Sequence, residues 1–379
     1  MTSVESLAEG KRVLICAGSG GVGKTTTAAA IAAGMAARGL KVCVLTIDPA
    51  KRLADSLGLA ELGNIERQVD PALFAEAGIE PGEGELWAMM LDSKATFDDV
   101  VAKHAPDEET RDAVLSNRIY QELSSALAGS QEYMAMEKLY ELWSEDRFDL
   151  LVLDTPPSRN ALDFLEAPNR LLQFIEGRSL QVFLAPTGFA AKVAGRGTSV
   201  TFSILKRITG VDLLSDLAEF FGSFRGMVGG FRERAAKVSE LLSDEQCTFL
   251  IVCGPQTETV SEAVFFFGKL QEQGLPFGGA IVNKVHVAGS APVKGLKTAL
   301  LGQLAPDLAP RVVRNYKDYR LLAKRDRRNI ERLAVELETS EIIEVPYLDS
   351  DVHDLGGLFE VNRHLFANDP PWGSRKLGS

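Results

Sequence analysis

The sequence predicts an α/β protein in which a mostly parallel sheet is flanked by helices and carries a helical insertion. Three observations lead to this prediction. Apolar runs of strand length alternate with helical segments along most of the 379-residue chain. A glycine-rich loop joins the first apolar run to an alanine-rich segment, and residues 177–242 replace the alternation with helical sequence. Strands that alternate with helices form parallel sheets, because each connection must return to the other end of the sheet.

The glycine-rich loop, residues 18–26, reads Gly-Ser-Gly-Gly-Val-Gly-Lys-Thr-Thr. It follows the apolar run 12–17 and precedes residues 27–37, in the strand, loop and helix order of a P-loop nucleotide-binding fold. Its glycines let successive N–H groups point at one anion, and the helix N-terminus adds partial positive charge. Lys24 would reach the β- and γ-phosphates of a nucleotide, and the Thr25 hydroxyl would ligate Mg²⁺. The alternative is a purely structural glycine turn. The residues expected to hold the phosphates are Gly18, Gly20, Gly21, Val22, Gly23, Lys24, Thr25 and Thr26.

The remaining elements are predicted from apolar runs and from helical periodicity. Continuous apolar runs are typical of parallel strands that are covered on both faces. They predict strands at 41–47, 86–91 (at a sheet edge), 148–153, 248–253, 279–282 and 342–345. Helices are predicted at 53–57, 106–143, 160–175, 264–270, 315–338 and 352–366. The acidic residues that follow Pro106 favour a helix start there.

The break in this alternation divides the chain into parts. We predict that residues 1–176 and 243–367 form the two parts of a nucleotide-binding core, with a helical insertion at 177–242 and a frayed tail at 368–379. Apolar residues at spacings of three and four indicate one broad stripe on a helix of the insertion. The stripe either packs within the protein or forms a surface for a hydrophobic client or a membrane. Its residues are Leu213, Leu214, Leu217, Phe220, Phe221, Phe224, Met227, Val228 and Phe231.

Composition and charge argue against several classes of protein. The net charge is −11, whereas proteins that bind nucleic acid usually carry a basic field, so we expect no nucleic-acid partner. The first ten residues lack the basic start and apolar run of a secretory leader, and charges interrupt every long apolar stretch, so no transmembrane helix is predicted. Cys16, Cys43, Cys247 and Cys253 lie in or beside apolar runs. Buried thiols of this kind suit a reducing cytoplasm, where the protein is either free or peripheral to the membrane.

Three polar residues, Asp48, Asp154 and Asn283, each follow a predicted strand. The carboxyl ends of parallel strands meet at one rim of the sheet, where ligands bind. Asp154 would hold the metal there, or else cap the helix that follows. Asp48 would orient the attacking water or act as its base, or else start a turn as part of Asp-Pro. Asn283 would bond the edge of an adenine, or else be a plain turn residue.

Three segments together resemble the arsenite-pump and tail-anchored-protein-targeting ATPase family, which is related to the MinD and ParA ATPases. They are Gly-Gly-Val-Gly-Lys-Thr-Thr in the loop, Thr-Ile-Asp-Pro-Ala after the second strand, and Asp-Thr-Pro-Pro-Ser after a later strand. The resemblance covers most of the chain and extends to residues 230–234, to Val282-Asn283 and to Val345-Pro346.

The resemblance implies a dimeric ATPase that uses ATP and Mg²⁺. It implies that Asp48 in switch I handles the water, that Asp154 opens switch II, and that Asn283 reads adenine, with Pro346 also at the nucleotide. It further implies that the two halves of the dimer close on ATP and open after hydrolysis, which moves client-binding helices.

The chain departs from the family pattern in three ways. Members usually carry a signature lysine at the second position of the loop, which reaches the partner's phosphates, and Ser19 stands there in this chain. The missing charge would come from Lys51 or Arg159, or from a paralogous partner that keeps the lysine, so the dimer is either a homodimer or a heterodimer. The Cys-x-x-Cys pair that holds an intersubunit zinc in the eukaryotic targeting factors is absent. The four dispersed cysteines also form no thiol cluster for arsenite.

Three functions remain open at this point. The first is a targeting or chaperone-like switch that captures a hydrophobic client or membrane protein. The second is the energising ATPase subunit of an anion or metalloid efflux system. The third is a positioning ATPase similar to MinD or ParA.

Overall fold

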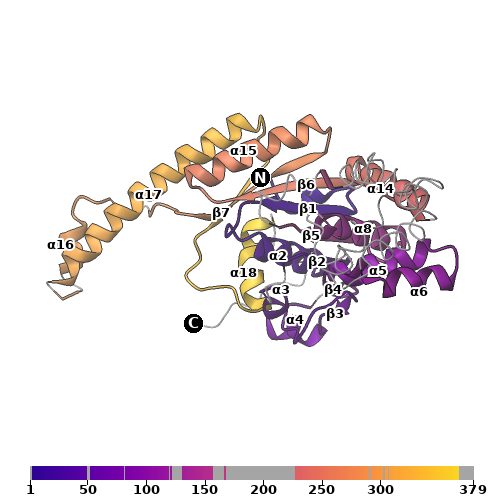
Figure 1. Ribbon diagram of the computed structural model, residues 1–379. Helices are drawn as coiled ribbons and strands as arrows, with labels where there is room; N and C mark the ends of the chain where they lie inside the picture. Colours follow the sequence, from indigo (N-terminus) through magenta and orange to yellow (C-terminus); the bar gives the residue numbers. More distant parts are fainter. Residues whose placement is uncertain are drawn as a thin grey trace, which may run out of the picture. The chain divides into compact units, whose positions relative to one another are not determined.

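The computed structural model describes residues 2–48, 52–80, 82–118, 120–121, 130–156, 166–167, 227–289, 292–301, 304–305 and 307–366. Within these residues the chain forms an eight-stranded sheet with the order β3-β4-β2-β5-β1-β6-β7-β8 (Figure 1). All pairings are parallel except the antiparallel pairing of β3 with β4. The predicted α/β class with a mostly parallel sheet is therefore confirmed. The strands are β1 (Val13–Gly18), β2 (Lys41–Thr46), β3 (Arg67–Gln68), β4 (Glu85–Met90), β5 (Leu150–Asp154), β6 (Cys247–Cys253), β7 (Phe277–Val285) and β8 (Ile342–Pro346).

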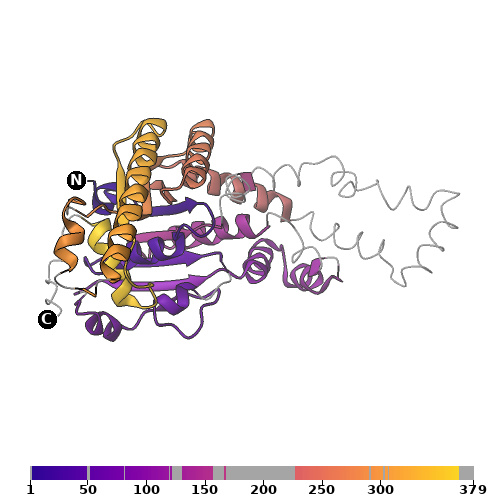
Figure 2. The same cartoon turned by 90° about the vertical axis from the view of Figure 1, so that its left-hand side faces the viewer.

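The central strands are buried along their whole length, which explains their continuous apolar sequences. Every residue of β1, β5 and β6 is buried, as expected for parallel strands with helices on both faces. The arrows of the central strands point the same way in Figure 2, so their carboxyl ends share one rim. Register pairs Asp154 with Cys16 on one side and with Thr46 on the other. The strand pairing thus places a threonine beside the carboxylate that ends β5.

Helices cover both faces of this sheet (Figure 1). One face carries α2 (Lys24–Ala36) and α18 (Leu355–Leu365), and the other carries α15 (Thr257–Glu272) and α17 (Leu308–Glu336). The alanine-rich α2 is buried on nearly all sides, so small side chains suit it better than an amphipathic pattern. A Cβ built on Gly34 of α2 would lie 2.4 Å from the ring of Phe366, which shows how closely the two segments pack. The shorter helices are α1 (Val4–Ala8), α3 (Arg52–Ser56), α4 (Pro71–Glu76) and α16 (Leu296–Leu301).

Contacts divide the chain into two compact units. The first holds the sheet and consists of Met1–Met90, Asp146–Leu162 and Ser243–Ser379. The second consists of Leu91–Glu145 and Asp163–Leu242. Residues 177–226 of the predicted insertion lie outside the described residues, as does the predicted tail, so the predicted boundaries of these parts remain predictions.

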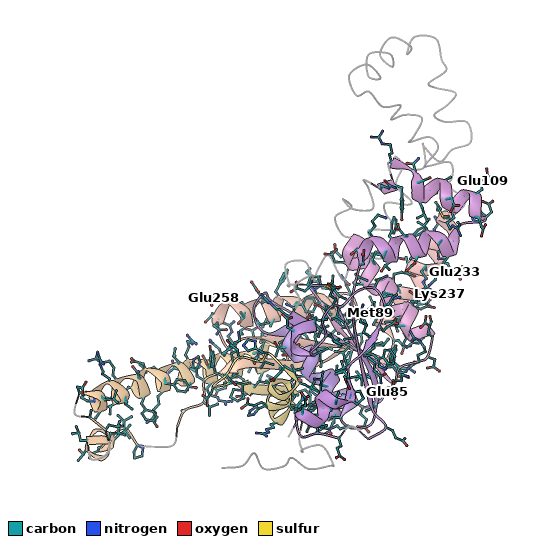
Figure 3. The ribbon with its side chains drawn as sticks, turned by 90° about the horizontal axis from the view of Figure 1, so that it is seen from below. Glu85, Met89, Glu109, Glu233, Lys237 and Glu258 are labelled. Carbon is teal, nitrogen blue, oxygen red and sulfur yellow. The ribbon has the colours of Figure 1, made fainter. Side chains whose placement is uncertain are left out.

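The described part of the second unit is helical. Its helices are α5 (Ser93–His104), α6 (Glu108–Ser116), α8 (Ser130–Ser144) and most of α14 (Val228–Ser243). Asp107 caps α6 by accepting a hydrogen bond of 2.7 Å from the amide of Thr110, in agreement with the predicted acidic helix start. On α14, Lys237 forms an ion pair of 2.7 Å with Glu233 (Figure 3). Of the predicted apolar stripe, Met227 and Phe231 are fully buried; its members before Met227 lie outside the described residues.

The structure corrects three sequence-based expectations about elements. The strand predicted at 86–91 is not at the edge, because the two-residue strand β3 pairs outside it. The single helix predicted at 106–143 is divided into α6 and α8, and α5 before it was not predicted. The predicted strand 279–282 continues to Val285, so Asn283 lies inside β7 rather than after it. None of the helices within the described ranges is both long enough and apolar enough to cross a bilayer.

Candidate active site

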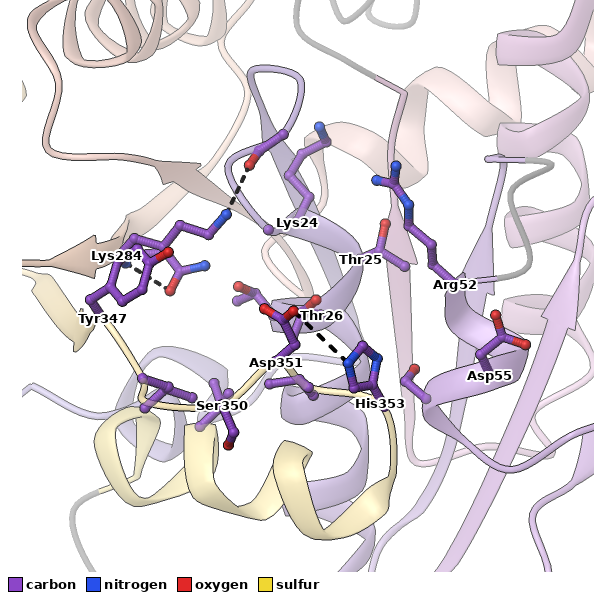
Figure 4. A pocket seen from close by; sticks show the side chains of 18 of the residues that line it. Lys24, Thr25, Thr26, Arg52, Asp55, Lys284, Tyr347, Ser350, Asp351 and His353 are labelled. Atoms are coloured by element: carbon purple, nitrogen blue, oxygen red, sulfur yellow. Dashed lines mark hydrogen bonds and ion pairs between the residues drawn. The ribbon is translucent and has the colours of Figure 1, made fainter.

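A pocket of about 670 Å³ opens at the carboxyl ends of the strands (Figure 4). It brings together the phosphate-loop residues, the segments that follow β2 and β5, the last residues of β7, and the end of β8 with the segment after it. Among the residues predicted for the site, the loop glycines at 20, 21 and 23, Lys24, Thr25, Thr26, Asp48, Asn283 and Pro346 all line it. The other lining residues are Thr27, Arg52, Asp55, Ser56, Thr155, Lys284, Tyr347, Leu348, Ser350, Asp351, Val352, His353 and Val361.

Two glycines of the loop have no room for a side chain. A Cβ on Gly18 would lie 1.9 Å from the carbonyl oxygen of Val252 in the neighbouring strand. A Cβ on Gly23 would lie 2.3 Å from Nδ2 of Asn283, and the backbone of Gly23 has φ of 95° as it leads into α2. Only glycine combines that conformation with such a close approach. These two positions therefore hold the loop tightly against β6 and β7.

Lys24 is buried and folds back on its own loop. Its Nζ donates a hydrogen bond of 2.8 Å to the carbonyl oxygen of Ser19. Burial lowers the pKa of Lys24, while the carboxylates of Asp154 and Asp48 oppose that shift. The ammonium is therefore confined beside the loop amides, where phosphate oxygens would bind.

Asp154, the last residue of β5, has a carboxylate with one satisfied oxygen and one unsatisfied oxygen. Its Oδ2 accepts hydrogen bonds from the hydroxyls of Thr25 (2.6 Å) and Thr46 (2.9 Å). Its Oδ1 is buried and has no hydrogen-bond partner among the described residues. Burial raises the pKa of Asp154 to about 6, against the opposing effect of the two threonines. A buried oxygen without a partner calls for an explanation such as a bound ion, and a carboxylate beside a threonine hydroxyl suits Mg²⁺ with its waters.

Asp48 and Thr46 lie at the end of β2. The amide of Asp48 donates a hydrogen bond of 3.2 Å to the hydroxyl of Thr46, so Asp48 stands next to the Asp154 cluster and lines the pocket. Thr46 was not predicted for the site. Its signal in the sequence is a single polar residue at the end of an apolar strand, and its meaning depends on the register with Asp154.

Ser19 is buried at the second position of the loop, where the resemblance predicts a lysine. Its hydroxyl donates a hydrogen bond to the carboxylate of Glu262, on α15. The second position of the loop therefore presents a neutral hydroxyl that is tied to an acid. Of the cations predicted to replace the lysine, Lys51 and Arg159 lie outside the described residues. Arg52, which was not predicted, lines the pocket.

Asn283 contacts the loop directly. Its Nδ2 donates a hydrogen bond of 2.9 Å to the carbonyl oxygen of Val22, and its Oδ1 accepts one of 2.9 Å from the amide of Lys284. Pro346 ends β8 on the same side of the pocket, and the exposed ring of Tyr347 follows it. Tyr347 was also missed; its signal is an aromatic residue directly after the Val-Pro segment.

The four cysteines do not contribute to this site. All four are buried thiols that form no disulfide, as the sequence predicts. Burial raises the pKa of Cys253 and of Cys247 to about 12, which keeps both as neutral thiols.

Comparisons with known proteins agree on one family. Residues 11–292 match the model of a family described as "Anion-transporting ATPase". The ATPase GET3 of Podospora anserina is 23% identical over 275 residues, which span 72% of this chain and 73% of that protein. The ATPase GET3B of Arabidopsis thaliana is 27% identical over 303 residues, 75% of this chain and 66% of that protein. A putative arsenical pump-driving ATPase of Halobacterium salinarum is 33% identical over 180 residues, 47% of this chain and 27% of that protein.

Proposed function

The chain belongs to the anion-transporting ATPase family and is an ATPase, and from that premise we propose that it is a Mg²⁺-dependent dimeric switch. In this proposal ATP closes the dimer, hydrolysis opens it, and the cycle serves to bind a hydrophobic client or a membrane partner in the cytoplasm or at the membrane surface.

The observation that carries the Mg²⁺ dependence is the half-satisfied carboxylate of Asp154. Its free Oδ1 and the adjacent Thr25 hydroxyl are oxygen donors of the kind that Mg²⁺ prefers. A bound Mg²⁺ would supply positive charge at the β- and γ-phosphate oxygens. Lys24 would exchange the Ser19 carbonyl for those same oxygens, and Asp48 would orient the attacking water.

The rest of the pocket supports one orientation of the nucleotide. With the phosphates on the loop, the base extends toward Asn283, Pro346 and Tyr347. We propose that the Tyr347 ring, 59% exposed, stacks on the adenine and that Asn283 contacts its edge. Because Asn283 also holds the carbonyl of Val22, it would position the base and the loop together.

The second candidate is an energising subunit of an efflux system, which the name of the Halobacterium salinarum relative favours. For arsenite this candidate needs thiolates that lie close together. The thiols of Cys16, Cys43, Cys247 and Cys253 are buried in strands of the sheet, and within the described ranges no three or more His, Cys, Asp and Glu side chains are grouped so that they could hold a metal ion. We therefore favour the targeting switch, and keep a MinD-like or ParA-like positioning ATPase as the third candidate.

The first test measures the native mass of the complex, recovered from its own cells in the presence of Mg²⁺ and ATP, and identifies every chain in it. We expect a dimer. The second test adds peptides that carry one apolar membrane segment, and we expect the dimer to bind them and to release them after ATP hydrolysis. A peptide of the same length with a polar segment is the control. A monomer that binds neither peptide would contradict the proposal, and a mixed dimer with a lysine-bearing paralogue would make this chain one half of an asymmetric ATPase.

A further inference from the structure

At the second position of the phosphate loop, where the resemblance predicts a lysine, this chain has no cation. The second position of the loop is Ser19, and its hydroxyl donates to Glu262, so this corner holds a neutral donor next to an acid. Hydrolysis of a nucleoside triphosphate needs positive charge on the γ-phosphate and on the leaving oxygen, since catalysis is mostly positioning and charge neutralisation. Lys24 and the Mg²⁺ proposed above would meet part of that need, and a further cationic side chain at the γ-phosphate would add to it.

Arg52 is the described residue best placed to supply it. It is the first residue of α3 and lines the pocket with Lys24, Thr25 and Asp48. In Figure 4 its side chain extends toward the end of the pocket where Lys24 and Thr25 lie, while Lys284 and Tyr347 lie at the other side. Its exposed guanidinium forms no hydrogen bond or ion pair with another residue that the structure describes.

The rest of α3 fixes the position from which Arg52 projects. Leu53 and Ala54 are 1% and 4% exposed, and Leu57, just after the helix, is fully buried. The hydroxyl of Ser56 donates to the carbonyl oxygen of Leu53 at 3.0 Å, which ties the single turn internally. A long side chain on an anchored backbone loses less freedom when it binds, which favours a preorganised contact.

Lys284 is another cationic residue among the described residues that line the pocket, and it is less suited to this role. Its Nζ lies 3.4 Å from the carbonyl oxygen of Gly21, on the side of the pocket that also holds Tyr347. It also follows Asn283 in β7, where the base rather than the γ-phosphate is expected. A guanidinium additionally offers a planar pair of donors that matches two phosphate oxygens, which an ammonium does not.

We propose that Arg52 is a catalytic residue of ATP hydrolysis that supplies, from the same chain, the charge that the loop lacks at Ser19. The role rests on the proposed function of this pocket. In the reaction, the water oxygen forms a bond to the γ-phosphorus while the bond from that phosphorus to the β–γ bridging oxygen breaks, so ATP⁴⁻ and water give ADP³⁻, HPO₄²⁻ and one proton. Arg52 donates N–H groups to the oxygens on which negative charge grows.

The test compares Arg52→Ala with the wild type in the complex as it is isolated. We expect kcat to fall about 100-fold, the usual cost of one transition-state donor, while the Kd of Mg²⁺–ADP stays near the wild-type value. Addition of aluminium fluoride should tighten ADP binding to the wild type much more than to the variant. Arg67→Ala is the matched control, because Arg67 is exposed on β3 and does not line the pocket.

Two outcomes would overturn the role. One is a kcat of Arg52→Ala equal to that of the wild type, which would leave the charge to a partner subunit. The other is an equal weakening of ADP and of ADP with aluminium fluoride, which would mean that Arg52 binds ground and transition states alike. If Arg52 acts through its positive charge, the kcat of Arg52→Lys must be higher than that of Arg52→Gln. A wild-type complex without turnover would instead refute the proposed function, and this role with it.

Discussion

Two buried carboxylates, one in each unit of the molecule, differ in how completely they are paired. Glu137 on α8 is paired at both oxygens, because Arg234 of α14 donates to Oε1 and the hydroxyl of Tyr133 donates to Oε2 at 3.3 Å. Asp154 in the sheet-bearing unit receives two hydroxyls on Oδ2 and none from the described residues on Oδ1. Burial raises the pKa of both groups.

The difference separates a structural group from a functional one. A buried charge that is fully paired joins two helices and leaves nothing to bind, whereas removal of its partner would be strongly unfavourable. A buried carboxylate with one free oxygen is destabilising by itself and becomes favourable only when a cation arrives. Three predictions test whether Glu137 and Asp154 behave in these two ways.

The largest expected effect is on turnover. Asp154→Asn keeps an oxygen that can accept from Thr25 and Thr46 but loses the negative charge, so we expect ATPase activity to fall by about 1000-fold. Steady-state phosphate release at saturating Mg²⁺ and ATP measures it. Asp146→Asn, which changes an exposed carboxylate bound to Arg12 on the surface, should leave the activity unchanged. Activity of Asp154→Asn within tenfold of the wild type would remove Asp154 from the metal site.

The next effect is on folding of the helical unit. Arg234→Met leaves the carboxylate of Glu137 buried without its cation, which costs about 3 kcal/mol. Urea unfolding followed by circular dichroism measures the loss. The double variant Glu137→Leu with Arg234→Met should recover most of it, because no charge is then buried. If the double variant is as unstable as Arg234→Met alone, packing of Arg234 rather than charge pairing is responsible.

The smallest expected effect is on the free energy of unfolding and its dependence on pH when no metal is bound. The pKa of Asp154 is raised from 3.8 to about 6, so its ionised form opposes folding once the pH exceeds both values. With EDTA present, Asp154→Asn should therefore be more stable than the wild type by about 2 kcal/mol above pH 6, and the gap should vanish below about pH 4. Thermal unfolding from pH 4 to 8 measures this. A gap that is independent of pH would show that charge burial is not its cause.

Local patterns predicted much of the fold and part of the site. The phosphate loop is contiguous, so its residues could be predicted from spacing alone. Apolar runs predicted β2, which ends at Thr46 just before Asp48, and β5, which ends at Asp154. The end of β7 was misjudged because its pairing with β8 shifts between Val282 and Val285 and Lys284 adopts φ of 61°. In the sequence, such an irregularity is easily taken for the end of the strand, although the strand continues beyond it.

The residues that sequence reasoning missed owe their roles to distant segments. Glu262 lies more than two hundred residues from Ser19 along the chain, and nothing around it in the sequence marks it. Thr46 acquires its role only through strand register with Asp154. Arg52 was missed because nothing in the sequence distinguishes it from other exposed cations, and only the structure shows that it lines the pocket.

The packing of α18 on α2 has a consequence for synthesis of the protein on the ribosome. Gly34 of α2 has the ring of Phe366 so close that no side chain fits between them, and Leu358 and Leu365 of α18 are fully buried in the same core. The phosphate loop and α2 leave the exit tunnel early, while their cover is translated hundreds of residues later. Until then the nascent chain exposes an apolar helix beside an unfinished sheet. The nucleotide pocket is therefore completed only late in synthesis, because Pro346 and Tyr347, which line it, are translated shortly before α18.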